Sequence, residues 1–224
     1  MSMVHDSYFL DWQRYTHELL NDNWPDPDQP SDWREILPNI KRHLRNVASS
    51  NLPDWKGELL ESDLEDNQAA IESDQPSQRI ETIRNLNYLA LLSCTVDHAL
   101  GYHYHWDILK EGLRSLIGEQ SGDELVLGVY WGGKAWDFPP DLVTYQYGVV
   151  LPDMIARHRR LAETVNAKTL ASKLREVDWS RNYPIYAQKI SDEDVAQTLH
   201  VLACLQSNLK HAEEQQCSIL YLLN

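Results

Sequence analysis

RIETIRNLNYLALLSCTVDHAL, residues 79–100, decides the predicted fold. Apolar side chains cover every side of a helix drawn through the centre of this stretch, and no proline or glycine interrupts it before Gly101. A helix that is apolar around its whole circumference is buried on all sides. We therefore predict a long central helix that starts at Pro76, a residue tolerated in the first turn, and continues through Leu109 and Leu113 to about Ile117.

Other segments share the helical spacing of apolar residues or a helix start signal. Pro152 falls inside one of them and predicts a kink, while GEQSGD, residues 118–123, predicts a turn. Ser191 is the expected N-cap of the last helix, because Asp192, Glu193 and Asp194 follow in its first turn. The expected helices cover residues 5–21, 31–47, 142–163, 170–177 and 191–212.

β-Hairpin signals are missing from the sequence, so the expected fold class is all-α, an irregular multi-helix bundle of roughly seven or eight helices. The length and the 42% apolar composition suit one globular domain. We predict a single all-helical domain over residues 1–224, with a candidate N-terminal helical subregion, 1–74, packed on residues 76–224.

The chain is acidic, with 34 Asp and Glu against 20 Lys and Arg and a formal charge of −14. This charge disfavours nucleic acid and anionic membranes as partners, and a basic protein is its electrostatic complement. No secretory signal opens the sequence and no stretch is apolar for long enough to span a bilayer, which indicates a cytoplasmic protein. Cys94, Cys204 and Cys217 lie far apart in apolar surroundings and are predicted to be reduced and buried.

Residues 54–74 concentrate the negative charge. Eight acidic residues against Lys56 give −7 in this segment, half of the total charge. Such a surface accelerates encounter with a basic protein and can mimic the phosphates of its nucleic acid. The alternative is that the acids only keep the protein soluble. The candidate contact residues are Asp54, Glu58, Glu61, Asp63, Glu65, Asp66, Glu72 and Asp74.

DHALGYHYHWD, residues 97–107, raises the question of a metal site. On the expected helix His98 and His105 lie on one side but about 10 Å apart along the axis, too far to share one ion. His103 points away from them and forms a row with Asp107 and Glu111, which could bind a metal if another helix supplied ligands. Because Lys110 and Arg114 share that face, we expect a salt-bridged surface and neither metal nor cofactor.

GVYWGGKA, residues 128–135, nearly matches a phosphate-binding loop, but Ala135 replaces the hydroxyl that would bind magnesium. We expect a glycine turn anchored by aromatic residues, with Tyr130, Trp131 and Trp136 as candidate contacts for a partner. The basic run 157–160 is expected to pair with the protein's own acids. No GxSxG, HExxH or local Cys/His signature is present, so we do not expect an enzyme.

Three segments together resemble a known family. Residues 84–102 (RNLNYLALLSCTVDHALGY), 141–165 (DLVTYQYGVVLPDMIARHRRLAETV) and 182–190 (NYPIYAQKI) are similar in order and pattern to the helical Immunity protein 49 family of bacterial polymorphic-toxin systems. The resemblance covers residues 76–224. It implies a helical protein that is made with a toxin and neutralises it by binding, and it supplies no catalytic residues.

The leading expectation is therefore an immunity protein, or antitoxin, that binds a cognate, basic bacterial toxin and occludes its active or substrate-binding surface. Two alternatives stay open at this point. One is a metal-dependent helical enzyme that uses His103, Asp107 and Glu111, and the other is a scaffold subunit of a larger assembly. The sequence does not specify the oligomeric state.

Overall fold

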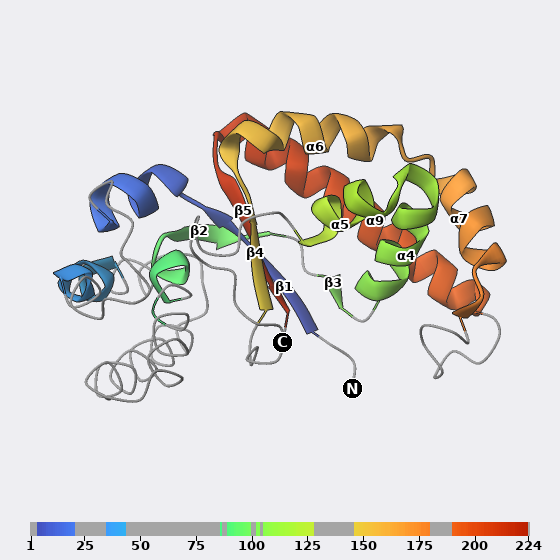
Figure 1. Ribbon diagram of the computed structural model, residues 1–224, viewed down its shortest axis with the longest axis horizontal. Coiled ribbons are helices and arrows are strands. Elements are labelled where there is room, and N and C mark those ends of the chain that lie inside the picture. Colours follow the sequence, from blue (N-terminus) through green and yellow to red (C-terminus); the bar gives the residue numbers. More distant parts are fainter. Residues whose placement is uncertain are drawn as a thin grey trace.

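The computed structural model describes residues 4–20, 35–43, 86, 89–99, 102–103, 105–127, 146–179 and 190–223. Most of these residues are helical, so the prediction of a mainly helical chain is confirmed. Five strands accompany the helices and form one sheet, which the sequence pattern did not predict. This sheet runs through the middle of the molecule, with helices on both sides (Figure 1).

Two strands from distant parts of the chain form the centre of the sheet. β1 (Val4–Leu10) pairs with β5 (Ser218–Leu223), and Tyr8 lies opposite Leu220 while Phe9 lies opposite Ile219. β4 (Gln146–Val150) pairs with the other side of β5. β2 (Thr95–His98) and β3 (Tyr102–His103) both pair with β1, and all the pairings are antiparallel.

Both faces of the central strands are buried, and each face belongs to a separate hydrophobic core. Because side chains alternate along a strand, Tyr8 and Leu220 enter one core, whereas Phe9 and Ile219 enter the other. The first core is completed by helical residues 12–19, which include the π-helix η1 (Arg14–Leu19), by Leu20 at the end of this helix, and by helical residues 35–43 and 89–93. Five helices cover the other face: α4 (Trp106–Ile117), α5 (Glu119–Leu127), α6 (Pro152–Thr164), α7 (Ala167–Glu176) and α9 (Asp192–Gln215).

The helix predicted over residues 5–21 is wrong in its first half, because residues 4–10 form β1. Helical structure begins at Trp12, after Asp11. The spacing of Tyr8, Trp12 and Tyr15 suggested one continuous helix, yet Tyr8 is a strand residue that enters the same core as Tyr15. A strand that is buried on both faces lacks the alternation of apolar and polar residues by which strands are recognised in a sequence.

The long central helix predicted from Pro76 to Ile117 is also wrong. Residues 89–93 are helical, but the chain turns at Cys94, forms β2 and β3, and becomes helical again only at Trp106. Ser93 Oγ donates to the carbonyl of Ala90 at 2.7 Å and Thr95 Oγ1 donates to that of Leu92 at 2.8 Å. These side chains cap carbonyls at the carboxyl end of the helix, since Ser and Thr can bond to the backbone locally and compete with helix continuation.

Two smaller predictions are corrected in the same way. The segment 142–163 begins as a strand over residues 146–150, and Pro152 starts α6 instead of kinking a longer helix. Proline suits this position because the first turn has no use for its missing N–H. The turn expected at 118–123 is confined to Gly118, after which α5 begins at Glu119.

Other expectations are confirmed. Ser191 caps α9 in a capping box, where its Oγ accepts the Asp194 N–H at 3.1 Å and Asp194 Oδ2 accepts the Ser191 N–H at 2.9 Å. Helical residues 35–43 and helix α7 fall within or close to their predicted ranges. Cys94, Cys204 and Cys217 are free thiols and are buried.

The corner between α4 and α5 depends on two glycines. Gly118 has φ of 92°, a conformation that other residues rarely adopt. Gly122 packs so closely on α4 that a Cβ there would lie 2.7 Å from the backbone nitrogen of Arg114. Since a backbone cannot move aside like a side-chain tip, this contact restricts residue 122 to glycine.

We predict that Gly122→Ala lowers the free energy of unfolding by about 1–2 kcal/mol, because overpacking outweighs the helix propensity that alanine gains. Urea denaturation measures the change. Ser121→Ala on the same helix is the control and should be neutral or slightly stabilising. A Gly122→Ala variant as stable as the wild type would show that α4 and α5 do not approach this closely.

Candidate functional site

The contact residues predicted from the sequence lie outside the described residues. This holds for the eight acids of segment 54–74 and for the three aromatic residues after Gly128. Their role as partner contacts therefore stays a prediction. The residues concerned are Asp54, Glu58, Glu61, Asp63, Glu65, Asp66, Glu72, Asp74, Tyr130, Trp131 and Trp136.

The row predicted for the alternative metal site does not lie on a single helix. His103 belongs to β3, where its backbone pairs with Val4, whereas Asp107 and Glu111 belong to α4. Lys110 Nζ lies 3.4 Å from Asp107 Oδ1, and Arg114 Nη1 lies 2.8 Å from Glu111 Oε1. Among the described residues, no group of three or more His, Cys, Asp or Glu side chains is arranged to hold a metal ion.

His98 and His105 do not lie on one helix either, because the described residues between residue 94 and Trp106 are not helical. The ring of His98, in β2, lies 4.7 Å from the ring of Tyr8, centroid to centroid. His105 is the N-cap of α4, and its Nε2 lies 3.2 Å from Oδ1 of Asp194 near the start of α9. His105 thus joins two helices, and the prediction that both histidines share one side of a helix is wrong.

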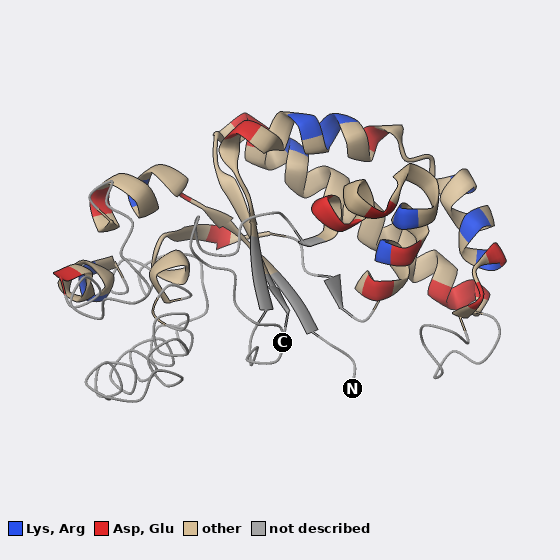
Figure 2. Ribbon diagram, in the orientation of Figure 1, with Lys and Arg blue, Asp and Glu red and all other residues tan. Residues whose placement is uncertain are grey.

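Two residues of the basic run in α6 pair with the protein's own acids, as predicted. Arg157 Nη2 lies 3.3 Å from Glu124 Oε2 in α5, and Arg159 bonds both to Glu163 at 2.8 Å and to Glu213 in α9. Basic and acidic residues lie near one another along α4, α6 and α7 (Figure 2). The described helices therefore neutralise much of their own charge locally.

The three cysteines are poorly suited to act as nucleophiles. Burial raises the pKa of Cys94 to about 12 and that of Cys217 to about 11, and it also raises the pKa of Cys204. The reactive form of cysteine is the thiolate, which a high pKa makes scarce at neutral pH. These thiols act as apolar core groups.

A crevice opens at the end of the sheet where β1 and β4 finish and β5 starts. β1 and β4 run in the same direction, because both are antiparallel to β5, and their carboxyl ends at Leu10 and Val150 meet the start of β5 near Ser218. After this end the chain leaves β1 for the η1 side of the sheet and leaves β4 for the α6 side (Figure 1). The chains therefore diverge to opposite faces at this end of the sheet and leave a crevice between them.

The crevice has a volume of about 580 Å³, within the usual range of ligand pockets. Trp12 and Thr16 are half-buried, Gln13, His17, Pro152 and Gln216 are exposed, and Leu20 is buried. The surface thus joins one aromatic ring and an apolar floor to amide, hydroxyl and imidazole groups. The lining residues are Trp12, Gln13, Thr16, His17, Leu20, Pro152 and Gln216.

The wall formed by residues 12–20 is positioned by Asp11. Its N–H donates to the carbonyl of Cys94 at 3.0 Å, and its Oδ1 accepts the Arg14 N–H at 2.9 Å. The chain then winds as a π-helix, in which the Leu20 N–H bonds to the carbonyl of Tyr15, five residues earlier. π-Helical turns are rare and occur frequently at functional sites.

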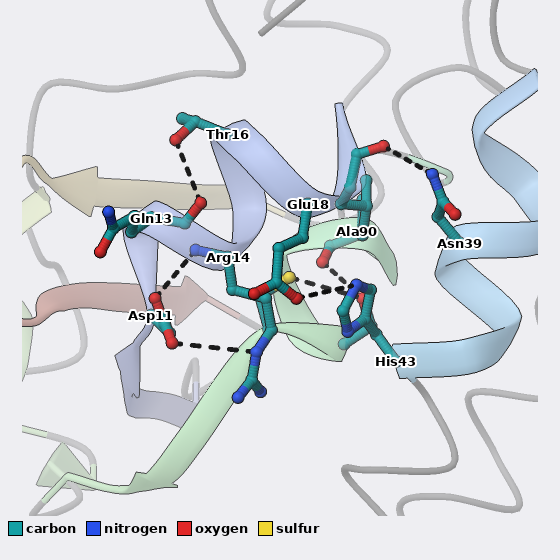
Figure 3. Close-up of polar contacts among 11 residues, drawn as sticks. Asp11, Gln13, Arg14, Thr16, Glu18, Asn39, His43 and Ala90 are labelled. Carbon is teal, nitrogen blue, oxygen red and sulfur yellow. Dashed lines mark hydrogen bonds and ion pairs between the residues drawn. The ribbon is translucent and has the colours of Figure 1, made fainter. Parts of the chain in front are cut away.

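The far side of η1 is fixed by helical residues 35–43 (Figure 3). Asn39 Nδ2 donates to the carbonyl of Leu19 at 3.3 Å, and Nε2 of the buried His43 lies 3.9 Å from Glu18 Oε2. Gln13 and Thr16 lie on the side of η1 away from His43 (Figure 3). The crevice wall is therefore backed by a core, so its side chains project from a supported element.

Sequence reasoning did not identify the crevice. The helical spacing of residues 5–21 carries no sign of a binding surface at Trp12, and Pro152 predicted a kink. The lining residues come from residues 12–20 after β1, from the start of α6 and from the C-cap of α9, and these are brought together only by the pairing of the strands. A local pattern does not contain this information.

No helix in the described ranges is long and apolar enough to cross a membrane. Comparison of the chain with protein-family models, curated proteins and solved structures found no match.

Two buried histidines make stability depend on pH. His158 in α6 is fully buried, and neither ring nitrogen has a hydrogen-bond partner among the described residues. Burial lowers the pKa of His158, and burial together with Arg42 and Arg14 lowers the pKa of His43. Both imidazoles stay neutral in the folded protein at pH values at which the unfolded chain already binds protons.

We predict that the free energy of unfolding is constant above pH 7 and falls as the pH drops through 6.5, the value for an unperturbed histidine. The slope reaches at most about 1.4 kcal/mol per pH unit for each histidine. Urea denaturation between pH 7.5 and 5.5 measures it. His158→Leu should flatten the curve, whereas His200→Gln, at an exposed position, should leave it unchanged. An equal slope in wild type and His158→Leu would contradict the assignment.

Proposed function

We propose that this chain is an immunity-type protein that binds a cognate, basic toxin domain in the cytoplasm and occludes its active or substrate-binding surface. The proposal assigns no catalytic step to the chain. Binding alone accounts for neutralisation, because a toxin whose surface is covered cannot reach its substrate.

The observation that carries the proposal is the distribution of charge. Within the described helices, several acids are paired with nearby cations, as in Lys110 with Asp107 and Arg114 with Glu111 and Asp123. Segment 54–74 contains eight acids and a single lysine, so its charge has no comparable local compensation in the sequence. A concentrated field of this kind steers a basic protein toward it and speeds association, and the effect weakens as salt increases.

Two further features support the proposal. The pattern of residues 76–224 resembles the Immunity protein 49 family, whose members neutralise toxins. Tyr130, Trp131 and Trp136 supply the kind of aromatic side chain that contributes disproportionately to binding energy at interfaces. Charge and aromatic anchors act at different steps, because charge governs encounter and buried aromatics slow dissociation.

Co-expression with the product of the neighbouring gene tests the proposal. We expect the two proteins to co-purify at about 50 mM salt, to separate as salt increases, and to restore growth of cells that the product alone inhibits. Failure both to form a salt-sensitive complex and to rescue growth would reject the proposed function.

Neutralising variants test the segment itself. Replacing Asp54, Glu58, Glu61 and Asp63 by Asn or Gln should slow association by about tenfold at low salt, because steering depends on local potential. The matched control replaces four exposed acids elsewhere in the chain and changes the net charge equally; these are Glu35, Glu119, Glu176 and Glu193. Surface plasmon resonance separates the rates. An equal loss in both variants would assign the effect to net charge and not to segment 54–74.

A further inference from the structure

One wall of the crevice is the carboxyl end of α9. This helix spans Asp192–Gln215 and ends at Gln216, which has φ of 54° and lines the crevice. The carboxyl end of a helix carries partial negative charge and is stabilised by cations. The last turn of α9 has no basic residue and instead contains Glu213 and Glu214. Arg159 pairs with Glu213, and Lys210 Nζ lies 3.9 Å from Glu214 Oε1, so the negative potential of this wall comes from the end of the helix itself.

The start of α6, at Pro152, carries partial positive charge, which the carboxylate of Asp153 opposes. Proline has no N–H to donate, and the adjacent Asp153 places an exposed carboxylate in the first turn. Asp153 has no ion pair among the described residues. Among the described residues that line the crevice, none is a lysine or an arginine. The charges around the crevice thus favour a cation.

The third wall offers an aromatic surface. Trp12 is half-buried and packs on the first core, with its ring 5.2 Å from that of Tyr15. Tryptophan is the best aromatic partner for a cation, and a guanidinium can also stack on it through its flat face. The amide groups of Gln13 and Gln216 supply acceptors near this ring.

We propose that the crevice receives an arginine side chain of the basic partner, with the guanidinium against Trp12 and directed toward the carboxyl end of α9. Arginine fits better than lysine because its planar group stacks and donates five hydrogen bonds at fixed angles. A volume of about 580 Å³ also admits the neighbouring backbone of a partner loop. This inference rests on the proposed function and names one contact within it.

A titration that needs no toxin tests the chemistry of the crevice. Acetyl-arginine-amide is added to the full ¹⁵N-labelled chain and followed by NMR, with acetyl-leucine-amide and acetyl-glutamate-amide as controls. We expect the arginine probe to shift the signals of Trp12, Gln13 and Gln216 and to bind with millimolar affinity, about two- to fivefold more tightly than the leucine probe. Equal shifts with the leucine or glutamate probe, or no shifts with arginine, would overturn the proposal.

Charge variants of Gln13 extend the test to the complex. Gln13 is exposed, so both replacements are compatible with the fold. Gln13→Glu should tighten partner binding and Gln13→Lys should weaken it, each by about two- to fivefold. Gln197 is also an exposed glutamine, but it lies in the second turn of α9, far from the carboxyl end that lines the crevice. Gln197→Glu and Gln197→Lys therefore serve as controls. If the Gln197 pair has the same effect as the Gln13 pair, the crevice is not the contact.

The two proposals fail separately. A chain that binds the arginine probe at the crevice but forms no toxin complex contradicts the immunity function and leaves the site chemistry standing. A salt-sensitive complex that responds equally to changes at Gln13 and Gln197 supports the immunity function and rejects the crevice as the arginine site.

Discussion

The pairing of β1 with β5 is the interaction on which the rest of the structure depends. These strands are separated by about two hundred residues, yet Tyr8 to Leu10 lie opposite Ser218 to Leu220. Their side chains alternate between the two cores, so the helices on both faces of the sheet pack against this one pair of strands. Loop closure over such a distance is costly in entropy and is repaid only when both cores are buried. We therefore expect the two cores to form cooperatively.

The same pairing creates the candidate site. Three connections meet at one end of the strands. There β1 leads to η1, β4 leads to α6, and α9 leads to β5. Each connection contributes residues to the crevice, and no single element could form it. Asp11 and the first core, on which Trp12 packs, hold the wall formed by residues 12–20 in place. Gln216, whose backbone has a left-handed conformation, forms the opposite wall at the end of α9. A binding surface built on the ends of regular elements is positioned more accurately than one carried by a free loop.

The start of α9 and the helical structure at residues 35–43 and in α7 were predictable, whereas the sheet was not. Ser191 with Asp194 is a local signal, and it correctly gave the start of α9. Residues 4–10 and 218–223 are recognisable as strands only through each other, because residues 7–10 and 218–221 are buried on both faces and lack the alternation of apolar and polar residues that marks a strand. The helix ends after residue 93, where the hydroxyls of Ser93 and Thr95 bond to carbonyls of the preceding turn. The apolar pattern of the segment favoured a continuous helix more strongly than these two residues indicated an end. The crevice depends on the sheet, so the sequence did not predict its lining residues. The pairing of Asp107 and Glu111 with nearby cations was predicted, because it depends only on neighbours along one helix.

Charge and shape have separate roles in this account. In the proposed complex, the acidic segment 54–74 governs encounter, and the crevice supplies one specific contact with the partner. Amide hydrogen exchange of the free chain and of its complex with the neighbouring gene product tests this most directly. We predict slower exchange on binding in residues 11–20, at the start of α6 and in segment 54–74, with α7 unchanged. Protection confined to α7 and the first half of α9 would contradict the account.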